Sequence, residues 1–267
     1  MTSSSESRRF LLILVVLALP WLTIGCGPGS QSDDVVVFAA ASLRDVLEEI
    51  AEAFETAQGS PVTFNFAASN VLARQIEAAP RCDVYLSASE EWMDHIESVD
   101  RLADGTRRTF LSNRLVAIVH QKSELPIRSP EDLARVEYRH LSIADPDAVP
   151  AGRYARQYLE ALPWEDGTLW DVVKARVVPG ANARAALALV EADRNLVGIV
   201  YRTDAAASER VRVVFEAGPA AAPEIRYAAA RVESERDPAG ALAFLAFLES
   251  PEGKAIFEKH GFMTAIE

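Results

Sequence analysis

Two hydrophobic periods alternate along this chain. Short apolar runs such as VVVFAA at 35–40 and LVGIVY at 196–201 have the length and composition of buried strands. After the first run, residues 43–54 carry apolar side chains at every third or fourth position, which predicts a helix packed on a core. Ser42 stands directly before this helix and is expected to be its N-cap.

The two patterns continue to alternate towards the end of the chain. Further strands are expected at 61–66, 83–87, 114–120, 140–144, 175–179, 211–215 and 225–232. Further helices are expected at 70–79, 89–97, 152–162, 182–193, 238–250 and 251–260, and another begins at 129–132. Regular alternation of this kind favours an α/β fold with mostly parallel sheets and helices on both faces.

The first 25 residues have a different pattern. Two arginines precede an apolar run at 10–24, which is shorter than the roughly 20 residues of a membrane span and is typical of an export signal. The run ends in LTIGC, which resembles the lipobox of bacterial lipoproteins. Residues 1–25 are therefore predicted to be a lipoprotein signal peptide, with Cys26 as the lipid-bearing residue and 26–32 as a tether. The alternative is an ordinary cleaved signal with an incidental cysteine.

Composition narrows the classes of function. The formal net charge is −12 and no basic run appears, so the chain has no long-range attraction for nucleic acid. Apart from Cys26 it contains one cysteine, Cys82, which cannot form an internal disulfide alone. Because Cys82 adjoins a predicted strand, we expect it to be a small core residue rather than a nucleophile.

Four short motifs of small, uncharged residues stand between a strand, or the loop after it, and a helix. They are AAAS at 39–42, AAS at 67–69, VPAG at 149–152 and GANA at 180–183. The first N–H groups of a helix have no partner within it, and together with the helix dipole they attract anions. Each serine could simply cap its own helix, but four such motifs in one α/β chain favour an anion site at the carboxyl ends of the strands.

These motifs, in their order, resemble the molybdate-binding proteins of bacterial ABC importers. The resemblance extends from residue 35 to 262. The matching stretches are FAAASL at 38–43, SNVLARQIEA at 69–78, DVYLSAS at 83–89 with the following WMD, DPDAVPAGRYA at 145–155, ARAALALVE at 183–191, GIVYRTDA at 198–205 and the KHGF end.

The resemblance implies a ligand site made of five residues. Ser42 and Ser69 would each offer a hydroxyl and an N–H, Ala151 and Ala183 would each offer a backbone N–H, and Tyr201 would offer its hydroxyl. The molybdate oxyanion itself would be bound through these residues, without a further cofactor. Relatives often carry a larger apolar residue at position 183 and a serine run around 68–70, where this chain keeps only Ser69.

The same resemblance implies the architecture and the cellular role. It implies a type II periplasmic-binding-protein fold, in which two α/β lobes joined by a hinge of crossing strands close on the ligand. The first lobe would contain 33–114 and 224–267, and the second lobe 115–223. The protein would be a monomer at the extracytoplasmic face of a membrane, anchored through Cys26, and would deliver its ligand to the permease of an ABC importer.

The chemistry of the five residues favours a dianion without a proton. All of them are donors, whereas a protonated phosphate needs an acceptor for its own hydrogen. Molybdate, tungstate and sulfate meet this condition, and the residues do not separate the first two. Sulfate is ranked lower on the family resemblance alone.

Other functions fit the sequence less well. Its four histidines are scattered outside any catalytic or zinc motif, and FAAASL lacks the glycines of a nucleophile elbow, so we expect no enzyme. Ferric iron bound by Tyr201 and Tyr227 is the nearer alternative. Arg44, Arg153 and Arg184 flank the motifs and are expected to lie on the solvated surface.

Overall fold

The computed structural model describes residues 34–234 and 238–264. The predicted signal peptide at 1–25, Cys26 and the tether at 26–32 lie outside these residues. Within the described ranges, no helix combines the length and the apolar character needed to cross a bilayer.

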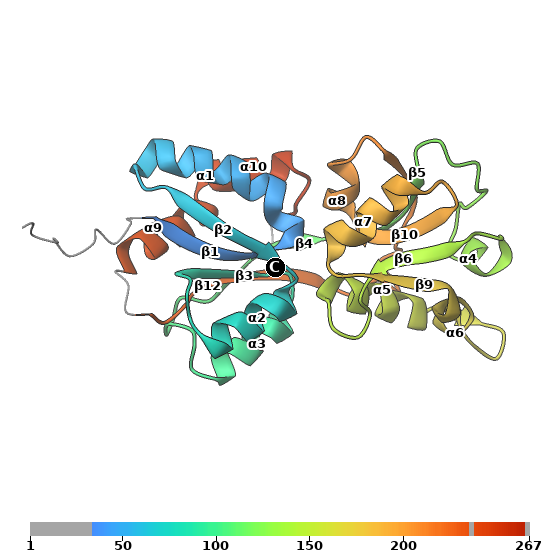
Figure 1. The fold of residues 1–267 in the computed structure, drawn as a ribbon, viewed down its shortest axis with the longest axis horizontal. Coiled ribbons are helices and arrows are strands. Elements are labelled where there is room, and N and C mark those ends of the chain that lie inside the picture. Colours follow the sequence, from blue (N-terminus) through green and yellow to red (C-terminus); the bar gives the residue numbers. More distant parts are fainter. Residues whose placement is uncertain (1–33, 235–237, 265–267) are drawn as a thin grey trace, which may run out of the picture. The chain divides into compact units, whose positions relative to one another are not determined.

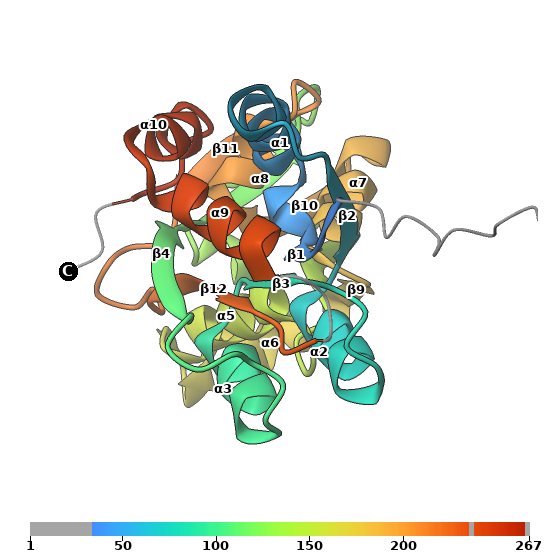
Figure 2. The same cartoon turned by 90° about the vertical axis from the view of Figure 1, so that its left-hand side faces the viewer.

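The first lobe is built on a five-stranded sheet with strand order β2-β1-β3-β12-β4 (Figure 1). Its strands are β1 Val35–Ala40, β2 Val62–Ala67, β3 Val84–Ser87, β4 Arg108–Asn113 and β12 Ile225–Arg231. Its helices are α1 Arg44–Gln58, α2 Ser69–Ala78, α3 Glu90–Ser98, α9 Pro238–Glu249 and α10 Pro251–Lys259, and the 3-10 turn η1 Ala41–Leu43 precedes α1. Figure 2 shows α1, α9 and α10 on one side of this sheet and α2 and α3 on the other.

The second lobe is built on another five-stranded sheet, with strand order β11-β5-β10-β6-β9. Its strands are β5 Leu115–His120, β6 His140–Ala144, β9 Val177–Gly180, β10 Leu196–Tyr201 and β11 Val211–Glu216, with a small hairpin of β7 Pro163–Trp164 and β8 Gly167–Thr168. Its helices are α4 Asp132–Arg135, α5 Pro150–Glu160, α6 Leu169–Val173, α7 Ala183–Ala192 and α8 Arg202–Ala206, and the 3-10 turn η2 Lys174–Arg176 follows α6.

Both sheets are mixed. In the first lobe β1 pairs in parallel with β2 and β3, whereas β12 runs antiparallel to β3 and β4. In the second lobe β6 is parallel to β9 and β10, whereas β5 runs antiparallel to β10 and β11. The antiparallel neighbours have a topological cause: the chain leaves the first lobe through β4 and β5 and returns through β11 and β12. The predicted type II fold is confirmed, with fewer parallel pairs than the alternation alone suggests.

The cores explain which predicted helices cover which face. In the first lobe, Phe54 of α1 packs edge-on against Phe244 of α9, with ring centroids 5.3 Å apart. On the opposite face Leu72 of α2 and Met93 of α3 are fully buried in one cluster with Cys82. Burial raises the pKa of the Cys82 thiol, which agrees with its predicted place in the core.

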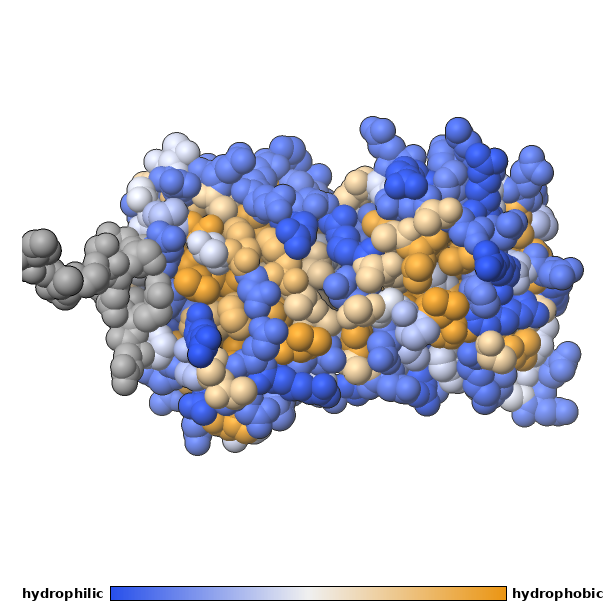
Figure 3. Space-filling view, viewed as in Figure 1, coloured by the Kyte–Doolittle hydropathy of each residue, from blue (hydrophilic) through white to orange (hydrophobic). Residues whose placement is uncertain are grey.

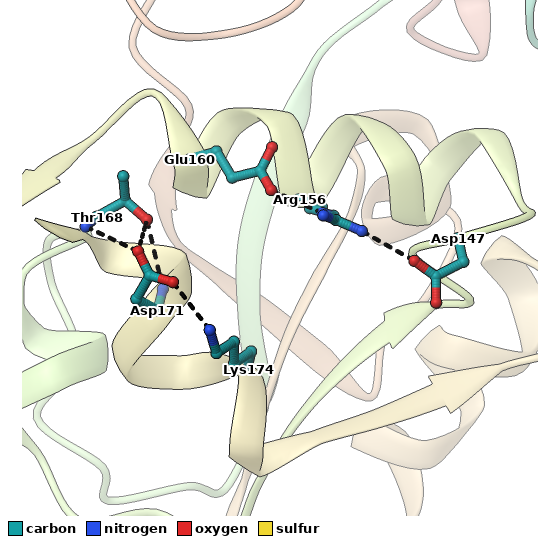
Figure 4. A network of polar contacts seen from close by, with 6 residues as sticks. All are labelled: Asp147, Arg156, Glu160, Thr168, Asp171 and Lys174. Carbon is teal, nitrogen blue, oxygen red and sulfur yellow. Dashed lines mark hydrogen bonds and ion pairs between the residues drawn. The ribbon is translucent and has the colours of Figure 1, made fainter.

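The polar contacts of α5 and α6 lie on the surface of the second lobe (Figure 4). Arg156 pairs with Asp147 at 2.9 Å and with Glu160 at 2.7 Å. Thr168 and Asp171 form a capping box at the start of α6. These contacts are exposed to solvent, and Asp147 lies in the loop between β6 and α5.

The local structure differs from the sequence prediction in two places. Ser42 is not an N-cap: it lies inside η1, and Leu43 is the residue before α1. Strand β4 was not predicted, because only Arg114 separates it from β5 and no turn residue marks the boundary. Ser89 does stand at the N-cap position of α3, and its side chain makes no capping hydrogen bond.

Candidate functional site

The strand ends of both lobes meet around one small cavity. Its lining is Ala40, Ala41, Ser42, Ala67, Ala68, Ser69 and Ala88 from the first lobe, and Val149, Pro150, Ala151, Asn182, Ala183 and Tyr201 from the second. Every lining residue is uncharged at neutral pH. The cavity has a volume of about 10 Å³, which is about the minimum for one water-sized molecule. In the space-filling view, weakly hydrophobic residues gather along the boundary between the lobes (Figure 3).

Helix starts provide much of this wall. The cavity touches η1 and the first residues of α2, α5 and α7. A Cβ atom on Gly152 would lie 2.1 Å from the carbonyl oxygen of Ala144, and one on Gly180 would lie 2.6 Å from the backbone nitrogen of Ala186. Glycine therefore lets α5 and α7 start directly against the ends of β6 and β9. Their first N–H groups, which lack partners within the helix, are thus brought to the same cavity.

Ser69 is fixed by two hydrogen bonds. Its Oγ accepts a hydrogen bond from the backbone N–H of Ala88 at 3.0 Å, and its carbonyl oxygen accepts one from the Tyr85 hydroxyl at 2.9 Å. Ser69 is 1% exposed. The hydroxyl proton of Ser69 takes no part in either bond, so it remains available to an acceptor in the cavity.

Ser42 belongs to a chain of buried polar side chains. Its Oγ lies 3.2 Å from the hydroxyl oxygen of Tyr227. Asn113 Nδ2 donates to that same tyrosine oxygen at 3.2 Å and to Thr203 Oγ1 at 2.9 Å. All four residues are buried. These hydrogen bonds connect Thr203 of the second lobe to Ser42 in the cavity wall. They pass through Asn113, the last residue of β4, where the polypeptide leaves the first lobe.

Tyr201 brings a free hydroxyl to the cavity. Its side chain is 1% exposed, and its oxygen has no hydrogen-bond partner among the described residues. Burial raises the pKa of Tyr201 well above its usual value, and the neighbouring Tyr227 raises it further. The hydroxyl is therefore neutral and is a hydrogen-bond donor for whatever occupies the cavity.

All five residues predicted from the sequence line this one cavity. Ser42 and Ser69 belong to the first lobe, and Ala151, Ala183 and Tyr201 belong to the second. Their role as ligand contacts stays a prediction.

Asn113 and Asn182 are further polar residues at the site that the sequence did not single out, and Tyr227 was considered only as an iron ligand. Asn182 caps α7, since its Oδ1 accepts a hydrogen bond from the N–H of Ala185 at 2.9 Å, and an asparagine directly before a helix is a recognisable N-cap. Asn113 and Tyr227 are 114 residues apart in the chain, and no spacing pattern connects them to Ser42.

The flanking arginines lie at the surface with acidic neighbours. Arg44 is half-exposed on α1, beside Glu48 at 3.5 Å. Arg153 and Arg184 are less exposed, at 31% and 25%, and the facing lobe supplies an acidic partner to each.

Arg153 and Arg184 form ion pairs between the lobes. Arg153 of α5 lies 2.6 Å from Glu91 of α3. Arg184 of α7 contacts Asp45 of α1 and, within its own lobe, lies 2.8 Å from Asp204. Asp204 is fully buried, and this burial raises its pKa to about 7 although Arg184 acts in the opposite direction.

Comparison with known proteins identifies the family. Residues 35–263 match the sequence profile of the bacterial extracellular solute-binding proteins. The chain belongs to this family. Members capture solutes outside the cytoplasm, so the predictions of a solute-binding protein and of a chain that is not an enzyme are both confirmed.

Relatives within the family are similar over nearly the whole chain. The molybdate-binding protein ModA of Escherichia coli is 34% identical over 260 residues, covering 96% of this chain and 98% of the relative. ModA of Haemophilus influenzae is 36% identical over 239 residues, covering 87% and 91%. YvgL of Bacillus subtilis, named as an ABC transporter substrate-binding lipoprotein, is 30% identical over 262 residues, covering 96% and 98%.

A solved structure supports the architecture of this solute-binding protein. The periplasmic molybdate-binding protein of Azotobacter vinelandii aligns with a TM-score of 0.76 at 23% identity, covering 87% of this chain and all of that chain. At this identity the similarity shows the fold. The resemblance to molybdate-binding proteins seen in the motifs is thus confirmed by the named relatives and by their shared fold.

Proposed function

We propose that this protein captures molybdate in the cavity between its lobes and delivers it to the permease of an ABC importer. The observation that carries the proposal is the cavity wall, where both lobes place neutral hydrogen-bond donors around one shared space. The two ModA relatives support molybdate as the ion. Ser42, Ser69, Ala151, Ala183 and Tyr201 are the proposed contacts.

Neutral donors suit a dianion that the protein must also release. A hydrogen bond to a charged partner contributes about 1.5–3 kcal/mol, so several of them balance a buried double charge. A fixed cation in the wall would instead leave an unpaired buried charge whenever the ion departs. The ion pairs of Arg153 and Arg184 lie outside the lining and engage protein carboxylates.

The lobes lie close together around the cavity. A volume of about 10 Å³ is about that of one water-sized molecule, so a five-atom oxyanion needs more space than this arrangement leaves. Donors from two lobes surround the space, so the lobes must part to admit an ion and close to complete its hydrogen bonds. Tungstate has the charge and shape of molybdate, and we propose that it binds as well.

A ligand screen tests the proposed function. Residues 33–267, which form one compact unit, are titrated by calorimetry with molybdate, tungstate, sulfate, phosphate and ferric citrate. We expect one-to-one binding of molybdate and tungstate, weaker sulfate binding, much weaker phosphate binding and no measurable ferric citrate binding. Tightest binding of sulfate or iron, or no binding of molybdate, would contradict the proposal.

A further inference from the structure

Both serines of the cavity have an acceptor site already in use. The Ala88 N–H occupies Ser69 Oγ, as described above. The side-chain hydroxyl of Ser42 has a single hydrogen-bond partner among the described residues, the hydroxyl of Tyr227. Which of these two hydroxyls donates decides what Ser42 presents to a ligand, because a hydroxyl is both a donor and an acceptor.

The backbone fixes the direction of this bond, starting at Asn113. The N–H of Arg114 donates to Asn113 Oδ1 at 2.9 Å, which identifies Oδ1 as the oxygen of the amide. The other amide atom is therefore the NH₂ group, which donates to Thr203 Oγ1 and to the Tyr227 hydroxyl oxygen. Tyr227 accepts this bond and must direct its own proton elsewhere.

Ser42 Oγ is the acceptor that lies within hydrogen-bond distance of that hydroxyl, at 3.2 Å. Tyr227 is fully buried, and Ser42 and Asn113 are its hydrogen-bond partners among the described residues. A buried hydroxyl proton without an acceptor costs about 1–3 kcal/mol, so Tyr227 donates to Ser42. One of the two lone pairs of Ser42 Oγ then accepts this bond, and the proton of Ser42 is free to donate into the cavity.

We propose that Asn113 and Tyr227 are specificity-determining residues that orient Ser42 as a donor towards the ligand, and so select oxyanions that carry no proton. The inference rests on the proposed function and goes beyond it, because neither residue lines the cavity. Two of the three hydroxyl oxygens in the lining, those of Ser42 and Ser69, thereby lose acceptor capacity. A hydrogenphosphate ion therefore finds one acceptor position fewer at each serine for its own proton.

The test compares two anions that differ in this proton. Sulfate and phosphate are similar in size, and near pH 8 both are mainly dianions, but phosphate keeps one hydrogen. Competition of each against molybdate is measured by calorimetry on residues 33–267, and the ratio of the two inhibition constants is the readout. We expect the unchanged protein to favour sulfate strongly.

Two variants change the orientation of Ser42 in different ways. Tyr227→Phe removes the proton that occupies Ser42 Oγ, which frees this oxygen to accept from hydrogenphosphate. Asn113→Asp replaces a donor with an acceptor, so Tyr227 turns its proton away from Ser42. We expect both to reduce the preference for sulfate over phosphate by about tenfold or more, with molybdate binding weakened but retained. The added charge of Asn113→Asp affects both dianions alike and cancels in the ratio.

Tyr85→Phe is the matched control. It also removes a buried tyrosine hydroxyl beside a cavity serine, but this hydroxyl donates to the carbonyl oxygen of Ser69 and not to a side-chain hydroxyl. The ratio should stay as in the unchanged protein, whatever happens to absolute affinity. Thermal unfolding shows that each variant is folded.

The outcomes separate the two proposals. If the unchanged protein does not bind molybdate, the proposed function is wrong. If it binds molybdate and Tyr227→Phe and Asn113→Asp keep its sulfate-to-phosphate ratio, the function stands and the orientation of Ser42 by Asn113 and Tyr227 is refuted. A folded Tyr227→Phe variant that binds no anion also refutes it, since the hydroxyl would then do more than orient Ser42.

Discussion

The proposed dianion site depends on single hydroxyl groups. Ser42, Ser69 and Tyr201 each bring a hydroxyl to the cavity wall, and the oxygen of each serine already has one hydrogen-bond partner in the protein. The alanines of the wall contribute backbone and allow close approach. Substitutions that remove a hydroxyl should therefore have a larger effect than those that alter an alanine side chain without adding bulk.

We predict that Ser42→Ala, Ser69→Ala and Tyr201→Phe each weaken molybdate binding by about 1.5–3 kcal/mol, or about ten- to a hundredfold. Each change deletes one donor to a buried dianion and keeps the backbone N–H. Calorimetric titration measures the effect. Ser142→Ala is the control, since this buried serine donates to the carbonyl oxygen of Ala186, away from the cavity. Unchanged affinity in Ser42→Ala and Ser69→Ala would contradict the proposed contacts.

A second prediction concerns Asp204 and pH. Burial raises its pKa from an ordinary value of 3.8 to about 7, so the folded chain binds this proton more tightly than the unfolded chain. The contribution of Asp204 to the free energy of unfolding is therefore greatest below pH 4 and is lost as the pH rises towards 7. For one group the slope is at most about 1.4 kcal/mol per pH unit.

Asp204→Asn tests this prediction. Thermal unfolding is measured at pH 5 and pH 8 for both proteins, and the variant should lose less stability between the two values than the unchanged protein. The comparison isolates Asp204, because the other ionisable groups are the same in both. Equal losses would show that the aspartate does not take up its proton in this range.

At the level of elements, the first turns of several helices form the cavity wall, and ion pairs on helix surfaces connect the two lobes. α5 and α7 reach the cavity with their first turns, and each carries an arginine that pairs with the first lobe through Glu91 or Asp45. These two ion pairs exist only when the lobes are close, so they favour the closed arrangement.

We predict that the double variant Asp45→Asn with Glu91→Gln releases molybdate faster. Partly exposed ion pairs contribute up to about 1 kcal/mol each, so the loss of two should raise the dissociation rate by up to about thirtyfold, with a smaller change in the association rate. Stopped-flow fluorescence measures both rates. Glu48→Gln is the control, because Glu48 pairs with Arg44 inside the first lobe. Equal dissociation rates in the double variant and the control would exclude a role for these pairs in closure.

The sequence predicts most elements but not their pairing. Strands such as β1 and β10 and helices such as α1 follow directly from hydrophobic period and length. The antiparallel position of β12 between β3 and β4 depends on contacts between distant segments, which a local pattern does not record. The short helix α8 also escaped notice, since five residues are too few to show a helical period.

The residues of the candidate site also fall into two groups, those that the sequence predicts and those that only the structure reveals. Its five predicted residues stand in motifs at strand ends, where the chain itself marks the place. Asn113 and Tyr227 act through partners far away in the chain, so their connection to Ser42 required the structure. The same is true of Arg153 and Arg184, whose acidic partners belong to the other lobe.

For the whole molecule, the remaining prediction is its location. We propose that Cys26 carries lipid and anchors the protein at the outer face of a membrane, as its LTIGC motif and the lipoprotein relative suggest. Since one acyl chain gives only marginal binding, stable anchoring requires more than one. Cys26→Ala should move the protein from the membrane fraction to the soluble fraction in fractionated cells. If the variant stays in the membrane fraction, the lipid anchor is wrong.

The central claim is that one dianion is held between the lobes by neutral donors. Diffraction from crystals of residues 33–267 grown with tungstate tests it most directly, because tungsten scatters anomalously and its position is found without reference to the protein. We predict one strong anomalous peak per chain in the cavity, with oxygens within hydrogen-bond distance of Ser42 Oγ, Ser69 Oγ and the Tyr201 hydroxyl. A peak beside Arg153 or Arg184 in place of the cavity, or no peak at all, would contradict the account.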